Sequence, residues 1–568
     1  MAETTLALTT AAGSWLQRAA RRPLPTILIV VSLAWISGLA LLPPLDRDES
    51  RFAVASREMV ESGNYVDIRF ANAPRYNKPV GIYWLQSASA WLWGPAFRNR
   101  IWVYRLPSLL GGLLSVLLLY FLARSIAPPE TALLASLLLG TSILLTAESM
   151  IATTDAVLLA TVIAAQAVLM RIYLAARGSA RPSLFLVLGG WAALAAGLLI
   201  KGPVIIAVLG STALVLSVWD RDWRWMAGAR PLFGAGVVLV LVGPWAIAIA
   251  LASHGAFYQQ SLGHDFGAKI LGGEESHGAP PGYYLALLSL TFWPATLLLL
   301  PAIAAAFRRR NNPAVRYLLA WSGAVWVLFE LVPTKLPHYI LPAYPALALL
   351  AALWAAVPYE GKEGRWDGIL RYAAAVQFAI ALIALIVLCV VLPERLGGTV
   401  GLYLLIGTAT GFFTGCAALI LLLRRHLVSA AGLAMACALL FDLLLAWMVA
   451  PQLHALWLSP RAAELVAAQR ASANAPVVLD GYVEPSLVFL LGSNTRIGPA
   501  SKAAAAAEET GLALVENRVA PLFLSDLRRR GDVVIALGRV FGLDYSTGRE
   551  QDVTLYRVKR PQTGISKT

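Results

Sequence analysis

The chain has 568 residues, of which 58% are hydrophobic and only 14% are charged. This composition excludes an ordinary soluble enzyme and indicates a polytopic, α-helical membrane protein. The formal net charge of +14 does not indicate nucleic-acid binding, because much of the lysine and arginine lies in short loops between apolar stretches. We therefore expect membrane lipids, and no nucleic acid, among the partners.

The first apolar stretch runs from about Leu24 to Pro43, directly after an arginine-rich segment. It is too long for the apolar part of a signal peptide, so we expect it to be retained as a span. Stretches long enough to cross roughly 30 Å of hydrocarbon bring the expected number of spans to about thirteen. They begin near Leu24, Pro107, Thr131, Ala152, Ser183, Pro203, Leu232, Tyr283, Tyr317, Tyr339, Tyr372, Val400 and Leu427.

Arginine is concentrated in alternate loops between these stretches. If the N-terminus is cytoplasmic, all the arginine-rich loops lie on the cytoplasmic side, as the positive-inside rule requires. The short loops on the other side, called the outer side below, carry few basic residues: Lys201, Lys269, Lys335 and Arg395. An odd number of spans then places the C-terminus on the outer side.

Two regions follow from this map. Residues 1–458 are expected to form a transmembrane domain with outer loops at about 44–105 and 253–282. Residues 459–568 are more polar and are expected to form a small α/β domain on the outer side. In this domain APVVLD and GDVVIAL predict strands, whereas RAAELVAAQ, SKAAAAAEE and VAPLFLSDLRRR predict helices.

A dense run of charge, from Asp46 to Arg51, opens the first outer loop. The residues after it space Phe52, Ala55, Met59 and Val60 for an amphipathic helix lying on the membrane interface. Taken alone, the run could simply end a span and anchor that helix.

Other segments on the outer side supply further charge. Lys78, Lys201, Lys335 and His338 each stand beside proline or glycine, and Asp155 begins a span, where a carboxylate is costly unless it is paired or faces water. A single lysine there would usually be an anchor that reaches toward the interface. Cations from several segments on one face instead favour a site for an anionic lipid headgroup.

Arginine and tyrosine side chains complete the predicted headgroup site. Lysine binds phosphate as a point charge and arginine binds it as a bidentate donor, so Arg51 joins the set. Tyr76, Tyr83, Tyr339 and Tyr344 could form its amphipathic walls, although an ordinary aromatic belt explains each of them as well.

No cofactor is assigned by the sequence. A divalent metal ion could find ligands in the second outer loop, but neither that loop nor Asp48 with Glu49 has a diagnostic spacing. The loop residues concerned are His264, Asp265, Glu274, Glu275 and His277. Motifs for nucleotide binding are absent from the sequence.

Five ordered motifs carry a resemblance to a known family. They are DESRFA, YNKPVGIYWLQ, ATTDA, LLIKGPV and TKLPHYILPAYPALALL, and with them roughly residues 20–350 resemble the polyprenyl-phosphate-dependent, GT-C-type glycosyltransferases. Within that superfamily the chain most resembles the 4-amino-4-deoxy-L-arabinose transferases of lipid A, which are related to the protein O-mannosyltransferases. The resemblance implies Asp48, Glu49 and Asp155 as catalytic acids and Lys78 as a substrate-binding residue.

The resemblance also implies substrates and a location. The donor would be a sugar attached to undecaprenyl phosphate, the acceptor a lipid A phosphate, and the place the periplasmic face of a bacterial inner membrane. We expect a monomer. Because the leaving group is a phosphate, fixed cations such as Lys78, Lys201, Lys335 and His338 would assist its departure. Asp48 would be a general base for a hydroxyl acceptor, but for an ionised phosphate it would orient the acceptor or a cation, or pair with the donor's amino group.

Two alternatives stay open. The same fold could transfer another polyprenyl-phosphate-linked sugar to a protein or glycolipid hydroxyl, as protein O-mannosyltransferases do. A lipid-linked sugar flippase or transporter is the second alternative, and it would need ionisable groups along a path through the bilayer.

Overall fold

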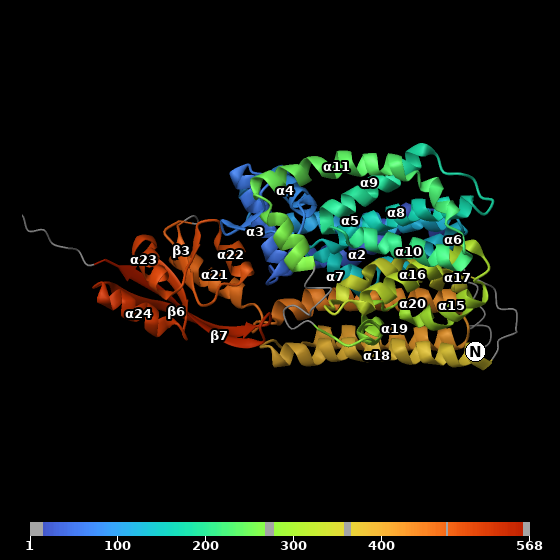
Figure 1. The fold of residues 1–568 in the computed structure, drawn as a ribbon. Helices are drawn as coiled ribbons and strands as arrows, with labels where there is room; N and C mark the ends of the chain where they lie inside the picture. The colour runs from blue at the N-terminus through green and yellow to red at the C-terminus, as the bar shows by residue number, and fades with distance from the viewer. Residues whose placement is uncertain (1–14, 267–277, 357–364, 473–474, 561–568) are drawn as a thin grey trace, which may run out of the picture.

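A computed structural model describes residues 15–266, 278–356, 365–472 and 475–560. The chain forms a long helical bundle, and a small C-terminal α/β domain lies at one end of it (Figure 1). Helices α3 and α4 of the first outer loop lie at this same end of the bundle. The predicted fold class, a polytopic helical membrane protein with a small C-terminal α/β domain, is confirmed.

Within the described residues, nine helical segments are long and apolar enough to cross a membrane, or up to ten if one bent pair counts as a span. The nine are α5 (Ile101–Arg124), α8 (Asp155–Ala175), α9 (Leu184–Lys201), α11 (Pro231–Ala252), α16 (Pro313–Leu331), η4 with α17 (Pro337–Ala355), α18 (Arg365–Arg395), α19 (Leu402–Leu423) and α20 with its continuation (Leu427–Gln452). Shorter apolar helices lie in α2 (Pro23–Leu41) and form α10 (Val204–Asp220) and α15 (Thr296–Arg308). The described residues thus have fewer full-length spans than the thirteen expected, because the stretches from Leu24, Pro203 and Tyr283 contain only shorter apolar helices and the stretch from Thr131 forms the bent pair.

Two predicted spans are broken. The stretch from Thr131 forms α6 (Pro129–Gly140) and α7 (Ile143–Met150), which meet at 62°. The stretch from Tyr283 forms α14 (Tyr283–Thr291) and α15, which are separated by a turn that contains Pro294. Proline lacks the amide donor that a continuous helix needs, which accounts for the second break.

The first outer loop folds as α3 (Asp48–Ser62), a two-stranded hairpin of β1 (Arg69–Phe70) and β2 (Ala73–Pro74), α4 (Gly81–Trp93) and the short η1 (Pro95–Phe97). The helix predicted after the charged run is present as α3, and its place on the membrane interface stays a prediction. Ser56 and Arg57 are fully buried alongside Phe52 and Met59, because α3 packs against α4 on one side and against α22 of the C-terminal domain on another.

The remaining segments of the membrane domain are short. Residues 224–229 form a 3₁₀ turn, η2 (Arg224–Ala229), between α10 and α11. In the second outer loop α12 (Ala256–Tyr258) continues into η3 (Gln259–Phe266).

The C-terminal domain is a five-stranded sheet with helices packed on it. In chain order it contains α21 (Leu458–Gln469), β3 (Val477–Asp480), α22 (Pro485–Leu491), β4 (Thr495–Ile497), α23 (Ala500–Thr510), β5 (Leu512–Glu516), α24 (Ala520–Arg529), β6 (Val533–Asp544) and β7 (Arg549–Lys559). The strand order is β4-β3-β5-β7-β6, in which β3 runs parallel to β4 and β5, and β7 is antiparallel to β5 and β6. Both predicted strands and all three predicted helices are present. The division of the chain into residues 1–458 and 459–568 stays a prediction.

Two glycines bring the outer ends of α4, α9 and α10 together. A Cβ on Gly81 would lie 2.7 Å from the carbonyl oxygen of Leu199, so α4 can approach the end of α9 closely only with glycine at this position. Gly202 has φ +66°, which lets the chain turn from α9 into α10 directly after Lys201. These approaches place the segment around Lys78 above the end of α9.

Candidate active site

Asp155 and Lys201 form a buried ion pair at the outer ends of two spans. Asp155 is the first residue of α8, where the positive end of the helix dipole favours a carboxylate. Lys201 is the last residue of α9, and its Nζ lies 2.6 Å from Oδ1 of Asp155. The side chain of Lys201 is 8% exposed and that of Asp155 is 7% exposed. A carboxylate at the start of a span was expected to be paired or to face water, and this ion pair shows that Asp155 is paired.

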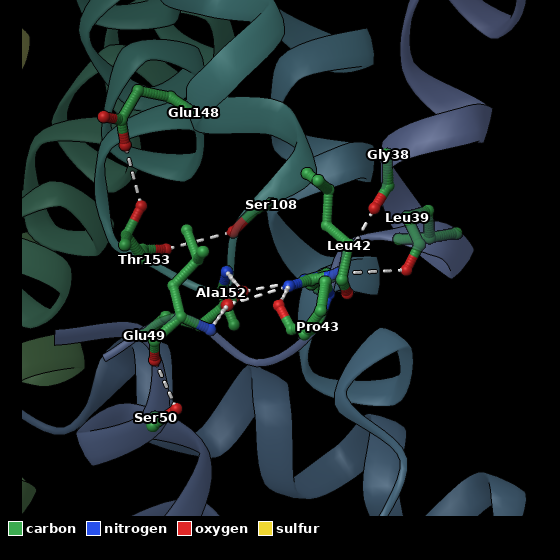
Figure 2. Close-up of polar contacts among 12 residues, drawn as sticks. Gly38, Leu39, Leu42, Pro43, Glu49, Ser50, Ser108, Glu148, Ala152 and Thr153 are labelled. Carbon is green, nitrogen blue, oxygen red and sulfur yellow. Dashed lines mark hydrogen bonds and ion pairs between the residues drawn. The ribbon is translucent and has the colours of Figure 1, made fainter. Parts of the chain in front are cut away.

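His338 lies between Asp155 and a second buried carboxylate, Glu148. Its Nε2 is 3.9 Å from Asp155 Oδ2, and its Nδ1 is 3.7 Å from Glu148 Oε1. Glu148 comes from α7 and accepts a hydrogen bond of 2.8 Å from the hydroxyl of Thr153, as Figure 2 shows. An imidazole that faces two carboxylates can carry a proton or a positive charge within the site.

Asp155, Lys201 and His338 line one pocket of about 170 Å³, whereas Glu148 lies outside its lining. The Lys201 ammonium lies 5.1 Å from the centre of the Tyr339 ring, so the aromatic face forms a wall beside the cation. Five predicted site residues thus meet in one place: Lys78, Asp155, Lys201, His338 and Tyr339. Apolar side chains such as Leu158 and Phe329 complete the lining. The pocket therefore combines cations with an apolar wall, as a lipid-linked phosphate requires.

Asp48 lies near this pocket, outside its lining. It is the first residue of α3, its side chain is 62% exposed, and its nearer carboxylate oxygen is 3.9 Å from Arg51. Its negative charge acts on both His338 and Glu148. An exposed carboxylate in this position can meet a substrate that enters the pocket.

Glu49, next along the chain, has a different environment. Its two carboxylate oxygens accept hydrogen bonds of 2.8 Å from Nε and Nη2 of Arg105, and both side chains are buried. Glu49 also accepts from the backbone amides of Leu45 and Ala152 at 2.8 Å. With its oxygens occupied in this way, Glu49 holds the outer ends of α3, α5 and α8 together. The geometry supports a structural role for Glu49, and its catalytic role stays a prediction.

Arg105 extends this ion pair to the end of the first span. Its guanidinium donates to the backbone carbonyls of Leu42 and Pro43 at 2.7 and 2.9 Å. A buried arginine with this many acceptors fixes the path of the chain from α2 toward α3.

Five predicted substrate-binding residues lie outside the pocket lining, and one of them is Arg51, which lies beside Asp48. The Lys335 ammonium donates to the carbonyl oxygen of Val332 at 2.9 Å and is buried. Tyr76 donates to Asp67 at 2.8 Å, Tyr83 packs against Phe52 with ring centres 5.4 Å apart, and Tyr344 shares a hydrogen bond of 2.7 Å with Thr291. Their roles in binding stay predictions.

A metal site can be assessed only in part. No group of three or more potential ligands occurs among the described residues. Of the suggested loop ligands, Glu274 and His277 and the residues between them, together with the side chains of His264 and Asp265, lie outside the described residues.

Sequence reasoning missed Glu148 and Arg105. Glu148 stands in the stretch AESMIATT, and an acid inside an apolar stretch is itself a sign of a functional or paired group. Arg105 stands just before the predicted second span and was treated only as the end of a loop. Its partner is far away in the sequence, so spacing alone gave no signal for the pair.

Comparisons with known proteins show what the chain as a whole resembles. Residues 77–247 match the family of dolichyl-phosphate-mannose-protein mannosyltransferases. The chain is 31% identical over 330 residues to the undecaprenyl phosphate-alpha-4-amino-4-deoxy-L-arabinose arabinosyl transferase of Erwinia tasmaniensis, covering 56% of this chain and 57% of that protein. It is 31% identical over 329 residues to the protein of the same name from Pseudomonas paraeruginosa, covering 55% and 57%. The matched segment thus spans less than two thirds of these relatives.

Solved structures extend the likeness over almost the whole chain. The crystal structure of ArnT from Cupriavidus metallidurans bound to undecaprenyl phosphate matches with a TM-score of 0.74 at 20% identity, covering 93% of this chain and 97% of that one. The apo structure of the same protein matches with a TM-score of 0.70 at 21% identity, covering 96% and 98%. The resemblance to polyprenyl-phosphate-dependent glycosyltransferases is confirmed, and the chain has the fold of ArnT.

Proposed function

We propose that this protein transfers 4-amino-4-deoxy-L-arabinose from undecaprenyl phosphate to a phosphate of lipid A on the periplasmic face of a bacterial inner membrane. One observation carries the proposal: Lys78, Lys201 and His338 meet Asp155 in a single pocket at the outer ends of the spans. Relatives over this region carry the name of that transferase, and the fold is that of ArnT.

The chemistry follows from the charges around the pocket. The bond between the anomeric carbon and the undecaprenyl phosphate oxygen breaks, and its electron pair leaves with the phosphate. A lipid A phosphate oxygen forms the new bond to that carbon from the opposite face, which inverts the configuration. Lys78, Lys201 and His338 stabilise the negative charge on the leaving phosphate in a site with little water.

Asp48 and Asp155 have separate roles in this proposal. Asp155 holds the Lys201 ammonium in the pocket, so it acts on the leaving group through that cation. The exposed Asp48 meets the substrates directly. Because an ionised acceptor phosphate needs no base, Asp48 pairs with the amino group of the donor sugar or orients the acceptor.

The membrane orientation is part of the same proposal. Arginine-rich loops on the opposite side from the pocket support a cytoplasmic N-terminus, a periplasmic pocket and a periplasmic C-terminal domain. We also propose that the protein works as a monomer.

The match to mannosyltransferases over residues 77–247 supports one alternative, in which another polyprenyl-phosphate-linked sugar is transferred to a hydroxyl. In that case Asp48 is the general base. The second alternative, a flippase for lipid-linked sugars, would move the donor across the bilayer and leave its glycosidic bond intact.

The deciding experiment uses the purified protein in liposomes with undecaprenyl-phosphate aminoarabinose and lipid A, followed by mass spectrometry of the lipids. The expected result is the mass gain of one aminoarabinose on lipid A, and its loss in the Asp48→Asn, Asp155→Asn and Lys78→Ala variants. Transfer only from a mannosyl donor to a hydroxyl acceptor would establish the first alternative. Donor translocation without transfer would establish the second.

A further inference from the structure

The geometry points to the C-terminal domain as the element that positions Asp48, with Asp46 as the positioning residue through which it acts. This inference rests on the proposed function, because Asp48 matters as a positioned group only if it meets the substrates. The evidence lies in the contacts between α3, the turn before it, and the C-terminal domain.

The turn before α3 is held from the C-terminal domain at two atoms of Asp46. Its carboxylate accepts a hydrogen bond from the hydroxyl of Ser486, at the start of α22. Its backbone amide donates to the hydroxyl oxygen of Tyr545, directly after β6, at 2.7 Å. Asp46 is two residues before Asp48, the first residue of α3. Both contacts therefore act on the segment that determines the position of Asp48.

This turn needs external support. Arg47, between the two aspartates, has φ +58°, a conformation that costs free energy for any residue with a side chain. Leu45 donates its amide to Glu49 on the membrane-domain side of the turn, while Ser486 and Tyr545 hold the other side. The position of Asp48 therefore depends on both domains.

The rest of α3 lies against the same helix of the C-terminal domain, as Figure 1 shows for α3 and α22. The buried Arg57 donates to the carbonyl oxygen of Phe489 at 2.8 Å, and its guanidinium stands 5.2 Å from the centre of the Phe489 ring. Near the end of α3, Glu61 accepts a hydrogen bond of 2.5 Å from Ser493. Contacts along the whole of α3 make it a shared element of the two domains.

A line of hydroxyl groups leads from the C-terminal domain to Asp46. Tyr482 and Ser459 share a hydrogen bond of 2.8 Å, Ser459 and Ser486 are linked at 2.7 Å, and Ser486 reaches Asp46. Hydroxyl groups can reverse their hydrogen-bond direction, so this line can serve Asp46 in either protonation state.

The charged surroundings agree with such a role. Burial, followed by the negative charges of Glu484 and Asp544, raises the pKa of Asp46 to about 7, although the hydrogen bonds from Ser486 and at Tyr545 oppose the shift. Arg47 and Arg51 act on Glu484 from the α3 side, and Glu49 and Asp46 act on Tyr545. The contact is thus sensitive to protonation near neutral pH as well as to the loss of either hydroxyl.

The test compares Ser486→Ala and Tyr545→Phe with wild type in lipid nanodiscs. The control variant is Ser525→Ala, because that hydroxyl bonds only within α24, to the carbonyl of Leu522 at 2.8 Å. Hydrogen exchange followed by mass spectrometry reports the amides of residues 45–51, and transfer assays report kcat and KM separately. The two variants change the C-terminal domain alone, so neither alters a group in the pocket.

The expected result is faster exchange at residues 45–51 and a fall in kcat of about tenfold in both variants, the effect of losing one hydrogen bond to a charged or strained segment. The KM for the donor, which Lys78 and Lys201 hold, stays at the wild-type value. Unchanged exchange in both variants, or faster exchange with wild-type kcat, would overturn the inference. If wild type transfers no aminoarabinose, the proposed function fails, whereas the exchange result still decides whether the C-terminal domain holds this turn.

Discussion

Lys201 and Asp155 are brought into an ion pair of 2.6 Å by two helices whose ends meet at the outer face, although 46 residues separate them in the chain. Each is the terminal residue of its helix, so the pair joins the start of α8 to the end of α9. Because both groups also line the pocket, the pair belongs to the fold and to the site at once.

This double role can be separated by a double-mutant cycle. Lys201→Met and Asp155→Asn each leave a buried partner without its counter-charge, which is expected to cost about 3–5 kcal/mol of unfolding free energy. The double variant should cost less than the sum of the two, since both charges are then gone. Unfolding midpoints measure the stability, and transfer assays should show loss of activity in all three variants.

A surface pair provides the control for this cycle. Arg529 and Asp526 lie 2.7 Å apart on α24, and the Arg529 side chain is 75% exposed, so Arg529→Met should leave stability almost unchanged. Additive losses in the Lys201 and Asp155 cycle would show that the two charges do not depend on each other.

Lys78 is expected to bind the donor phosphate directly. It comes from the segment just before α4 and lines the same pocket as Lys201 and Asp155. Lys78→Ala should weaken binding of undecaprenyl phosphate by about tenfold to a hundredfold, the effect of losing one charge-assisted contact. Lys78→Arg should restore part of it, because arginine also binds phosphate. Titration with undecaprenyl phosphate in nanodiscs measures the affinity.

Lys502→Ala is the matched control for Lys78, since Lys502 is an exposed lysine on α23 of the C-terminal domain. Equal affinity in the Lys78→Ala variant and this control would remove Lys78 from the binding site.

Glu49 should behave as a structural residue. Glu49→Gln leaves the buried Arg105 guanidinium without its carboxylate, so unfolding free energy should fall by about 3–5 kcal/mol. The fraction that remains folded should keep its kcat, because the carboxylate is fully engaged with Arg105 and backbone amides. Asp48→Asn should show the opposite pattern, with stability near wild type and lost transfer, since Asp48 is exposed. A folded Glu49→Gln protein with no activity would instead support the catalytic role that the resemblance implies.

The apolar stretches, their order and five of the residues that line the pocket could be predicted from the sequence. Apolar length marks a helix in lipid directly, and Lys78, Asp155, Lys201 and His338 stand out because ionisable groups are rare beside such stretches. Contacts between distant segments could not be predicted in this way. Nothing in the local sequence of Glu49 indicates that Arg105 would saturate it while the exposed Asp48 beside it stays open to substrate.

The C-terminal domain shows the same limit. Its alternating and amphipathic segments predicted two strands and three helices, but the short α22 gave no clear periodic signal. That helix makes the contacts with Asp46 and Arg57. The amphipathic pattern of α3 predicted one buried face, whereas the second domain buries another, which only the tertiary structure could show.

The contact at Asp46 should weaken as pH rises. Burial raises the pKa of Asp46 from 3.8 to about 7, so the docked form binds a proton more tightly than the exposed form does. Stability from this group is then fully present below about pH 4 and is lost as pH rises through 7. Hydrogen exchange at residues 45–51, corrected for the intrinsic pH dependence of exchange, should be at least about tenfold slower at pH 5 than at pH 8, which is the effect of one unit of pKa difference.

Asp46→Asn keeps the acceptor for Ser486 but cannot ionise, so it should remove this difference between the two pH values. Glu509→Gln, which neutralises an exposed carboxylate in the same domain, should keep it. An Asp46→Asn protein with the wild-type pH dependence would show that another group, such as Glu484, controls the contact.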